Sequence, residues 1–251
     1  MSAIIPIRES DLEFDNGTFD SAGFAATALS TWQALAAVID HTLLKPDATR
    51  VQVETLCEQA AKYRFACAMI NPAWVPTAVH ALAGTGVPVG VVVGFPLGAS
   101  LVSTLRQEAA SVTRLGAREV DMVLPIGQLK SGNHQAVHHA IHAAANVTHY
   151  NGAILKVILE TCLLTVEEKL RASEIAIHAG ADFLKTSTGF SNGGATPADV
   201  ALLRGVAGAR SGVKASGGIR TLADVRTLLE AGANRIGASA SVAILRELGA
   251  A

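Results

Sequence analysis

Two lysines and one aspartate are placed where a chain of alternating strands and helices would carry reactive groups. Asp121 lies in an apolar strand-like run, and Lys185 and Lys214 each end such a run. A charged lysine among apolar neighbours is costly, and a second ammonium group nearby raises that cost. We therefore expect the pKa of one lysine to fall toward neutrality. A neutral amine attacks carbonyls to form a Schiff base, the electron sink that a breaking carbon–carbon bond needs. Asp121 and Lys214 would then move protons, directly or through a water molecule.

Each of these lysines also has a simpler interpretation. A lysine at a strand end can be half of an ion pair or a ligand of a phosphate group, with no covalent role. A third lysine, Lys156, lies within the run of residues 153–160 and could line the same cavity as Lys185 and Lys214. For Lys156, a role as the counter-charge of Asp121 or Glu160 stays open beside a catalytic one.

Glycine-rich segments follow the last two strand-like runs, as Ala215-Ser-Gly-Gly-Ile and Ile236-Gly-Ala-Ser-Ala. In barrels of alternating strands and helices, the loops after strands seven and eight commonly bind phosphate through free backbone N–H groups. Hydroxyl groups directly after Lys185, in Thr-Ser-Thr-Gly, could orient substrate oxygens. The residues predicted to bind substrate and phosphate are Thr188, Gly189, Gly217, Gly218, Gly237 and Ser239.

The spacing of the histidines and cysteines does not predict a metal site. His134, His138 and His142 share one face of a helix, but they are remote from the strand ends and no carboxylate joins them. We interpret them as a solvated or crevice-facing stripe. The three cysteines are odd in number and never in C-x-x-C spacing, which fits a reducing compartment such as the cytoplasm. They are Cys57, Cys67 and Cys162.

The elements that must position these residues repeat with a regular rhythm. A short apolar run, a stretch with helical spacing and a glycine recur about every 28 residues, close to the length of one βαβ unit. Eight repeats predict a single (β/α)8 barrel, because an open six-stranded sheet would leave two runs unexplained. The runs begin near residues 39, 66, 88, 118, 153, 182, 212 and 234.

Composition excludes several classes of protein. Half of the 251 residues are apolar, 16% are charged and the net charge is −1. This balance rules out bulk disorder, and a nearly neutral chain lacks the positive field that nucleic-acid binding requires. Residues 65–105 contain no Asp, Glu, Lys or Arg, as a membrane span would. Prolines and glycines interrupt this stretch, so we predict buried strands and no membrane segment.

The first 30 residues differ from the rest of the chain. They carry five acidic residues and one arginine, and they lack the order of a signal peptide. We therefore expect a flexible N-terminal extension over residues 1–30 and a catalytic barrel over residues 31–251, in a cytoplasmic protein.

Seven ordered motifs resemble those of the deoxyribose-phosphate aldolase family over about residues 39–245. This family reversibly cleaves 2-deoxy-D-ribose 5-phosphate to D-glyceraldehyde 3-phosphate and acetaldehyde. The motifs are DHTLLKP (40–46), VVGFPLG (92–98), EVDMV (119–123) with IGQLKSG (126–132), LKVILET (155–161), FLKTSTGF (183–190), VKASGGIR (213–220) and RIGAS (235–239).

The resemblance implies a class I carbon–carbon lyase of deoxynucleoside and carbohydrate breakdown that needs no metal or other cofactor. It places the Schiff-base lysine at Lys185, the proton relay at Asp121 and Lys214, and the phosphate loops at the glycine-rich segments. It also implies a small phosphorylated sugar as substrate and a homo-oligomer, for which we expect a dimer.

Two positions depart from patterns in parts of the family. Met69 stands where many members have a cysteine, and Phe190 stands where some have a lysine near the phosphate. The first bears on inactivation by aldehydes and the second on phosphate affinity. Two rival functions remain at this stage. One is a Schiff-base barrel for a different phosphorylated ketose, and the other is a barrel that isomerises or only binds its phosphorylated ligand.

Overall fold

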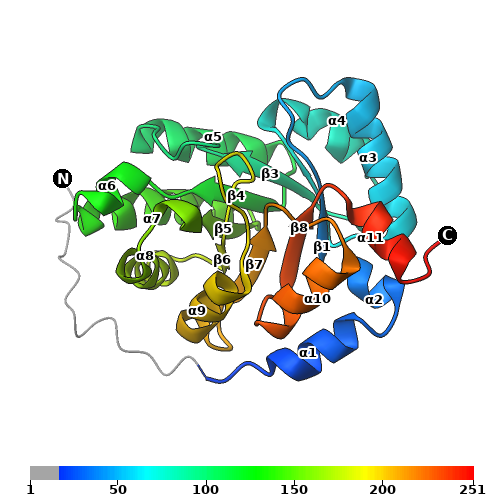
Figure 1. Cartoon of the computed structure of the whole chain (residues 1–251). Helices are drawn as coiled ribbons and strands as arrows, with labels where there is room; N and C mark the ends of the chain where they lie inside the picture. The colour runs from blue at the N-terminus through cyan, green and yellow to red at the C-terminus, as the bar shows by residue number, and fades with distance from the viewer. Residues whose placement is uncertain (1–16) are drawn as a thin grey trace.

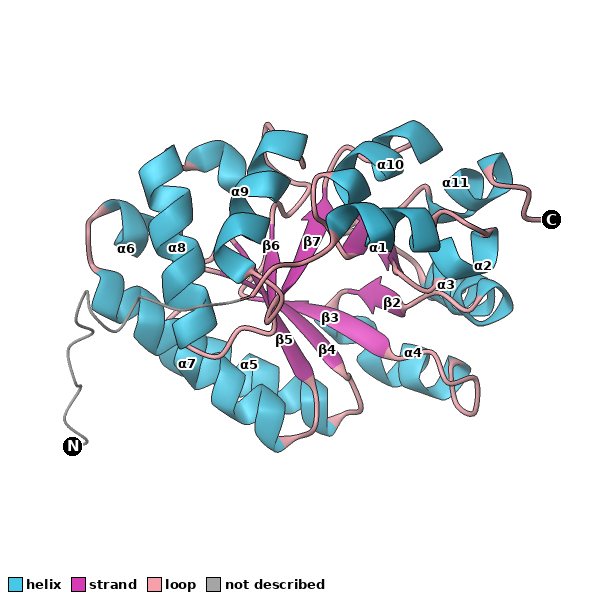
Figure 2. Ribbon diagram, turned by 90° about the horizontal axis from the view of Figure 1, so that it is seen from below, coloured by secondary structure: helices cyan, strands magenta, loops and turns pink. Residues whose placement is uncertain are grey.

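The computed structural model describes residues 17–251, and its centre is a closed barrel of eight parallel strands (Figure 2). Each strand pairs with the next in sequence, and the last pairs with the first. The eight predicted runs therefore each form a strand, and the prediction of a (β/α)8 barrel is confirmed. The strands are β1 (Ile39–Leu43), β2 (Cys67–Ile70), β3 (Val89–Val93), β4 (Glu119–Val123), β5 (Ile154–Ile158), β6 (Phe183–Lys185), β7 (Gly212–Ser216) and β8 (Arg235–Ala238).

Helices surround the barrel, and at least one follows every strand (Figures 1 and 2). Two further helices precede β1. The helices are α1 (Ser21–Ala28), α2 (Trp32–Ala36), α3 (Arg50–Tyr63), α4 (Val75–Ala81), α5 (Val102–Arg114), α6 (Ile126–Lys130), α7 (His134–Tyr150), α8 (Val166–His178), α9 (Pro197–Ala207), α10 (Leu222–Glu230) and α11 (Ser241–Glu247).

Local sequence explains where several of these helices begin. Thr49, Thr165 and Thr221 each accept a hydrogen bond from a backbone N–H of the first turn, and a side chain three residues later bonds back to the threonine N–H. These capping boxes satisfy backbone donors that have no partner within the helix. They fix the residue at which each helix begins after the loop that follows its strand.

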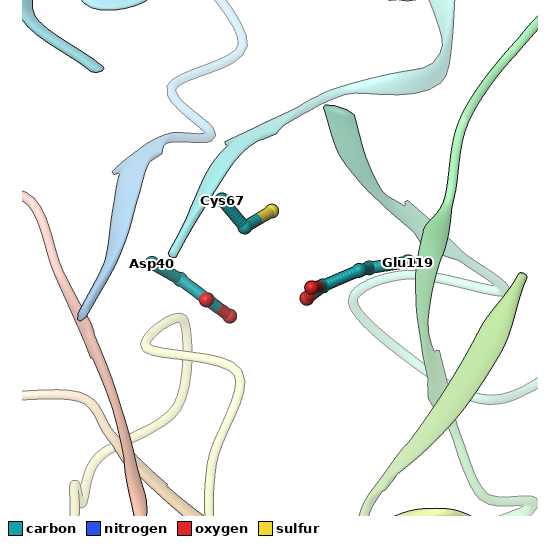
Figure 3. A group of neighbouring side chains, drawn as sticks. All are labelled: Asp40, Cys67 and Glu119. Atoms are coloured by element: carbon teal, nitrogen blue, oxygen red, sulfur yellow. The ribbon is translucent and has the colours of Figure 1, made fainter. Parts of the chain in front are cut away.

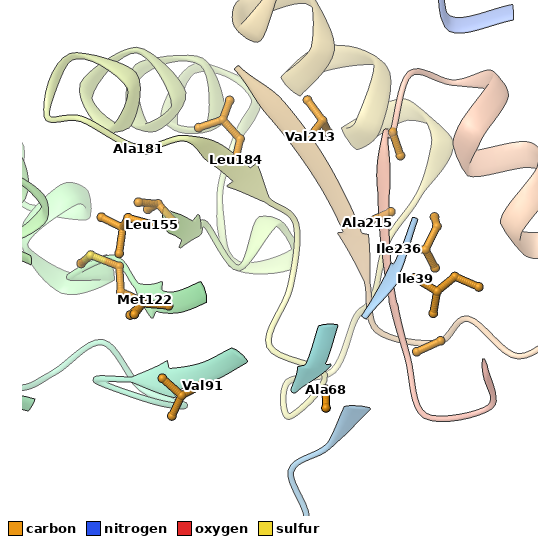
Figure 4. Packing of buried hydrophobic residues seen from close by; sticks show 14 of the residues in the cluster. Ile39, Ala68, Val91, Met122, Leu155, Ala181, Leu184, Val213, Ala215 and Ile236 are labelled. Carbon is orange, nitrogen blue, oxygen red and sulfur yellow. The ribbon is translucent and has the colours of Figure 1, made fainter. Parts of the chain in front are cut away.

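Alternating residues of the strands face two different environments. Apolar side chains such as Met122, Leu155, Leu184 and Val213 fill the space between the sheet and the helices (Figure 4). Because successive side chains of a strand point to opposite faces, their neighbours point into the barrel. The charged side chains among those neighbours, including Asp121, are buried in the interior.

The segment predicted as an extension contains a packed helix. Helix α1 is capped by the side chain of Asp20, which accepts from the N–H of Gly23, and it lies along α10 (Figure 1). Ala25 and Ala28 on this helix are buried. Residues 1–16 lie outside the described residues, and there the flexible extension stays a prediction.

The charge-free stretch of residues 65–105 forms β2, α4 and β3 and leads into α5. In the part of the chain that the structure describes, we find no helix with the length and hydropathy of a membrane span.

Candidate active site

Neighbouring strands bring the two predicted lysines together. Lys185 is the last residue of β6 and is directly opposite Lys214 of β7 in the strand register. The sequence had suggested that Lys214 ends its strand. Strand β7 continues to Ser216, so Lys214 lies within the strand. Asp121 of β4 is opposite Lys156 of β5 in the same way.

Asp121 is the centre of a buried hydrogen-bonded cluster. Its Oδ2 accepts from Lys185 Nζ at 2.8 Å and from Lys214 Nζ at 2.6 Å, and its Oδ1 accepts from Lys156 Nζ at 3.0 Å. All four side chains are almost wholly shielded from solvent. The structure thus joins Lys185, Lys214 and Asp121 through one carboxylate, and Lys156 is a counter-charge of Asp121.

The environment gives Lys185 the character of a nucleophile. Burial, which disfavours the ammonium form, and the nearby ammonium of Lys214 together lower the pKa of Lys185 to about 8, although the carboxylate of Asp121 opposes this shift. Burial also disfavours the ionised form of Asp121, but the attraction of the three lysines outweighs it and holds the pKa of Asp121 well below its usual range. At neutral pH the site therefore holds a carboxylate beside an amine that loses its proton readily.

A cavity of about 390 Å³ opens above these groups at the carboxyl ends of the strands. Lys185 and Lys214 lie at the cavity, and all six residues predicted to bind substrate and phosphate line it. Two larger hollows, of about 760 and 1070 Å³, lie on the outer surface against α5 and contain none of the predicted site residues. The lining residues are Thr42, Leu43, Leu44, Lys45, Lys185, Thr188, Gly189, Phe190, Lys214, Ser216, Gly217, Gly218, Gly237 and Ser239.

The glycine-rich loop after β7 has a conformation that brings its backbone to the cavity. Gly217 and Gly218 have φ angles of +87° and +79°, which side-chain-bearing residues rarely adopt. The loop is held by Gly217 O, which accepts from the N–H of Ala195. Gly237 leaves room for the side chain of Lys214, because an added Cβ would lie 3.0 Å from Lys214 Cε.

The hydroxyl groups after Lys185 mainly tie the site together. Thr186 Oγ1 donates to the carbonyl of Ser216 and accepts from its N–H, which links the ends of β6 and β7. Thr188 lines the cavity, but its hydroxyl donates to the carboxylate of Glu160. Glu160 therefore holds this loop, and it does not pair with Lys156.

Two further residues lie at the mouth of the cavity. Lys45 was not singled out from the sequence, and Phe190 was noted there only as a departure that bears on phosphate affinity. Lys45, in the loop after β1, is exposed and has no ion pair among the residues that the structure describes. Phe190 is half-exposed and its ring packs edge-on against Phe95, with 5.2 Å between ring centroids. The motif DHTLLKP contained Lys45, but only the folded loop shows that it lines the same cavity as the glycine-rich loops.

Three charged residues lie nearer the amino ends of their strands, and Lys156 of the cluster around Asp121 contacts two of them. We call Asp40, Glu119, Lys156 and Arg235 the lower charge layer. Arg235 Nη2 donates to both carboxylate oxygens of Glu119 at 2.7 Å, and its Nε donates to Asp40. Lys156 Nζ contacts Glu119 at 2.5 Å and lies 3.8 Å from Asp40. No role was predicted from the sequence for Asp40, Glu119 or Arg235.

Two carboxylates of this layer and a neighbouring thiol have the spacing of metal ligands (Figure 3). They belong to Asp40, Glu119 and Cys67 of β2. The chemistry of this group does not favour an ion. Lys156 and Arg235 already neutralise both carboxylates, and burial raises the pKa of the Cys67 thiol, so that it stays protonated. Among the described residues this is the one group of His, Cys, Asp and Glu with such spacing, and it includes no histidine of the α7 stripe.

The fold is a closed barrel, and it contains a buried, weakly basic lysine beside a glycine-lined cavity. These are the features of a barrel enzyme that uses an amine nucleophile. Comparison with known proteins narrows this class. A family model described as DeoC/LacD family aldolase matches residues 34–248. The chain belongs to this family.

Individual relatives agree with this assignment. The chain is 52% identical to a deoxyribose-phosphate aldolase of Geobacillus sp. over 84% of this chain and 94% of the relative. It is 52% identical to one of Thermoanaerobacter sp., over 85% of this chain and 96% of the relative. A solved deoxyribose phosphate aldolase of Aeropyrum pernix, described as tetrameric, superposes with a TM-score of 0.84 at 34% identity, covering 91% and 96% of the two chains.

Proposed function

We propose that the protein is an aldehyde-lyase that reversibly cleaves 2-deoxy-D-ribose 5-phosphate to D-glyceraldehyde 3-phosphate and acetaldehyde. The observation that carries this proposal is Lys185, which meets Lys214 and Asp121 beside a glycine-lined cavity. Relatives that share half of their residues with this chain are deoxyribose-phosphate aldolases.

In the cleavage direction, neutral Lys185 Nζ attacks C1 of the open-chain sugar, and loss of water gives an imine. A relay of Asp121, Lys214 and a water molecule removes the proton from the C3 hydroxyl. The electrons of the C2–C3 bond flow into the imine as the bond breaks, which releases D-glyceraldehyde 3-phosphate and leaves an enamine on Lys185. Protonation at C2 and hydrolysis then return acetaldehyde and the free amine.

The phosphate group would bind at the loops after β7 and β8, to backbone N–H groups of Gly217, Gly218 and Gly237 and to the hydroxyl of Ser239. Lys45 lies at the same cavity and would supply the positive charge that a phosphate dianion attracts. Thr188 and Gly189 would complete the wall near the reacting carbons. No step requires a metal ion or an organic cofactor.

We also propose that the protein works as a homo-oligomer in the cytoplasm. The Aeropyrum pernix relative is described as tetrameric, whereas the family resemblance led us to expect a dimer. All three cysteines are free thiols in the structure, which suits a reducing compartment. Sedimentation of the purified chain distinguishes a dimer from a tetramer, and a monomer at micromolar concentration would contradict the assembly.

Borohydride reduction in the presence of acetaldehyde tests the chemistry. Reduction of the imine should leave an ethyl group on Lys185, which peptide mass spectrometry locates. Lys185→Leu and Lys185→Arg should abolish both the adduct and cleavage while the fold is retained. Cleavage of the 2-deoxy sugar phosphate, compared with its 2-hydroxy counterpart, tests the substrate. A folded protein with no adduct on Lys185, or with turnover in Lys185→Arg, would defeat the proposal.

A further inference from the structure

The lower charge layer and the reactive cluster form one buried system of charges. Lys214 Nζ contacts both Asp40 and Asp121, and Lys156 Nζ bridges Asp121 to Glu119. Arg235 closes the system by contacting Asp40 and Glu119. Cys67 of β2 faces the same layer as a neutral thiol.

The charges of this system do not balance when every group is ionised. It contains three carboxylates, on Asp40, Glu119 and Asp121, and four cationic side chains, on Lys156, Lys185, Lys214 and Arg235. Fully ionised, it carries one excess positive charge away from water. Loss of a single proton makes the system neutral, which a buried site of low polarity favours strongly.

The contacts decide which cation loses that proton. An arginine does not deprotonate in a protein, so Arg235 is a fixed positive charge. Lys156 lies within 4 Å of three carboxylates and Lys214 contacts two. Lys185 contacts one carboxylate among the described residues, that of Asp121. Lys185 is therefore the least stabilised ammonium in the system.

We propose that Arg235 and Glu119 are positioning residues that keep Lys185 in its neutral, nucleophilic form by fixing the charge balance of the barrel interior. Neither residue lines the cavity, so neither meets the substrate. They act through Asp40 and Lys156, which transmit their charges to Lys214 and Asp121. This inference rests on the proposed role of Lys185 as the Schiff-base lysine.

The proposal predicts pH shifts of opposite sign for two substitutions. Arg235→Met removes the fixed positive charge, so a proton on Lys185 is better tolerated and its pKa rises. Glu119→Gln removes a negative charge, so the pKa of Lys185 falls. Two measurements report this pKa: the acid limb of the kcat/KM profile and the acid limb of borohydride trapping with acetaldehyde. In Arg235→Met both limbs should move to a pH about one unit higher, and in Glu119→Gln to a pH about one unit lower.

Three further variants serve as controls. Arg235→Lys keeps the positive charge and should leave the acid limb in place. The double variant Glu119→Gln, Arg235→Met removes one charge of each sign and should also leave it within about half a pH unit. Lys169→Met removes a cation from a Lys169–Asp199 ion pair between α8 and α9, outside the barrel, and should not move the limb.

The double variant keeps the proposal falsifiable if a single variant does not fold, because its balance of charges is that of the wild-type protein. Folding is checked by thermal unfolding and circular dichroism. Opposite shifts in the single variants, together with an unmoved limb in a folded double variant that traps acetaldehyde, support the proposal. Folded single variants whose limbs stay in place or move in the same direction would overturn it, as would a double variant whose limb moves by a full unit.

Failure of this inference can be told apart from failure of the proposed function. If wild-type protein forms no adduct on Lys185, the proposed function fails. If wild-type protein forms the adduct and the limbs of the charge variants do not move as expected, only the role of Arg235 and Glu119 fails.

Discussion

Replacement of Asp121 by asparagine should separate two steps of the proposed reaction. Asp121 contacts Lys185, Lys214 and Lys156 at 2.8, 2.6 and 3.0 Å, and asparagine has nearly the same shape without the charge. Loss of the carboxylate removes the proton acceptor of the relay. Loss of general acid–base catalysis of this kind lowers kcat about 10²- to 10⁴-fold.

The same substitution should favour imine formation. The carboxylate of Asp121 raises the pKa of Lys185, so its loss lowers that pKa from about 8. With a pKa of about 8, about a tenth of the amine is neutral at pH 7, and a fall of about one unit would make about half of it neutral. Trapping of acetaldehyde by borohydride at pH 7 should therefore rise about fivefold while cleavage is nearly lost.

The assay compares the initial rate of trapping, measured by mass spectrometry of the Lys185 peptide, with the rate of cleavage. Asp199→Asn is a matched control, because Asp199 forms an ion pair with Lys169 at 2.5 Å outside the barrel. This control should change neither rate. A folded Asp121→Asn variant that cleaves at more than about a tenth of the wild-type rate would refute the relay. Complete loss of trapping would refute the electrostatic reasoning.

Four other predictions follow from the site and the core. Lys45→Ala should raise KM for the sugar phosphate about tenfold and leave kcat/KM for unphosphorylated 2-deoxyribose unchanged. An equal loss of kcat/KM on both substrates would contradict a phosphate contact. Gly237→Ala should lower kcat with little change in Tm, because its Cβ would crowd Lys214 Cε at 3.0 Å; unchanged kinetics would argue against that crowding. For wild-type protein, kcat/KM should fall about tenfold per pH unit below about 8, since only neutral Lys185 attacks, and an inflection near the ordinary lysine value would contradict this. Leu155→Ala should lower the free energy of unfolding by about 2–5 kcal/mol in denaturant titrations, and a loss below about 1 kcal/mol would contradict its burial in the core.

The sequence predicted the barrel because parallel strands covered on both faces must be apolar for most of their length. The same rule made Asp121, Lys185 and Lys214 conspicuous, since few charges interrupt such runs. Their distances could not be predicted, because they depend on the stagger of neighbouring strands.

Other parts of the site gave weaker signals. Glu119 and Arg235 begin their strands, and a charge at a strand boundary is usually solvated. Only the closed register shows that both point inward and meet. Helix α1 was missed because its short, alanine-rich segment has no strong periodicity, and contact with α10 stabilises it.

The partners of Arg235 come from distant parts of the chain. It belongs to the last strand and contacts Asp40 in the first strand and Glu119 in the fourth, across 195 and 116 residues of sequence. During synthesis, Asp40 and Glu119 emerge from the ribosome long before the arginine that neutralises them. The balance of charges that produces a reactive amine therefore cannot exist in an incomplete chain. The reactive amine forms only when β8 docks. A half-made polypeptide carries an ordinary, protonated lysine that attacks free aldehydes slowly.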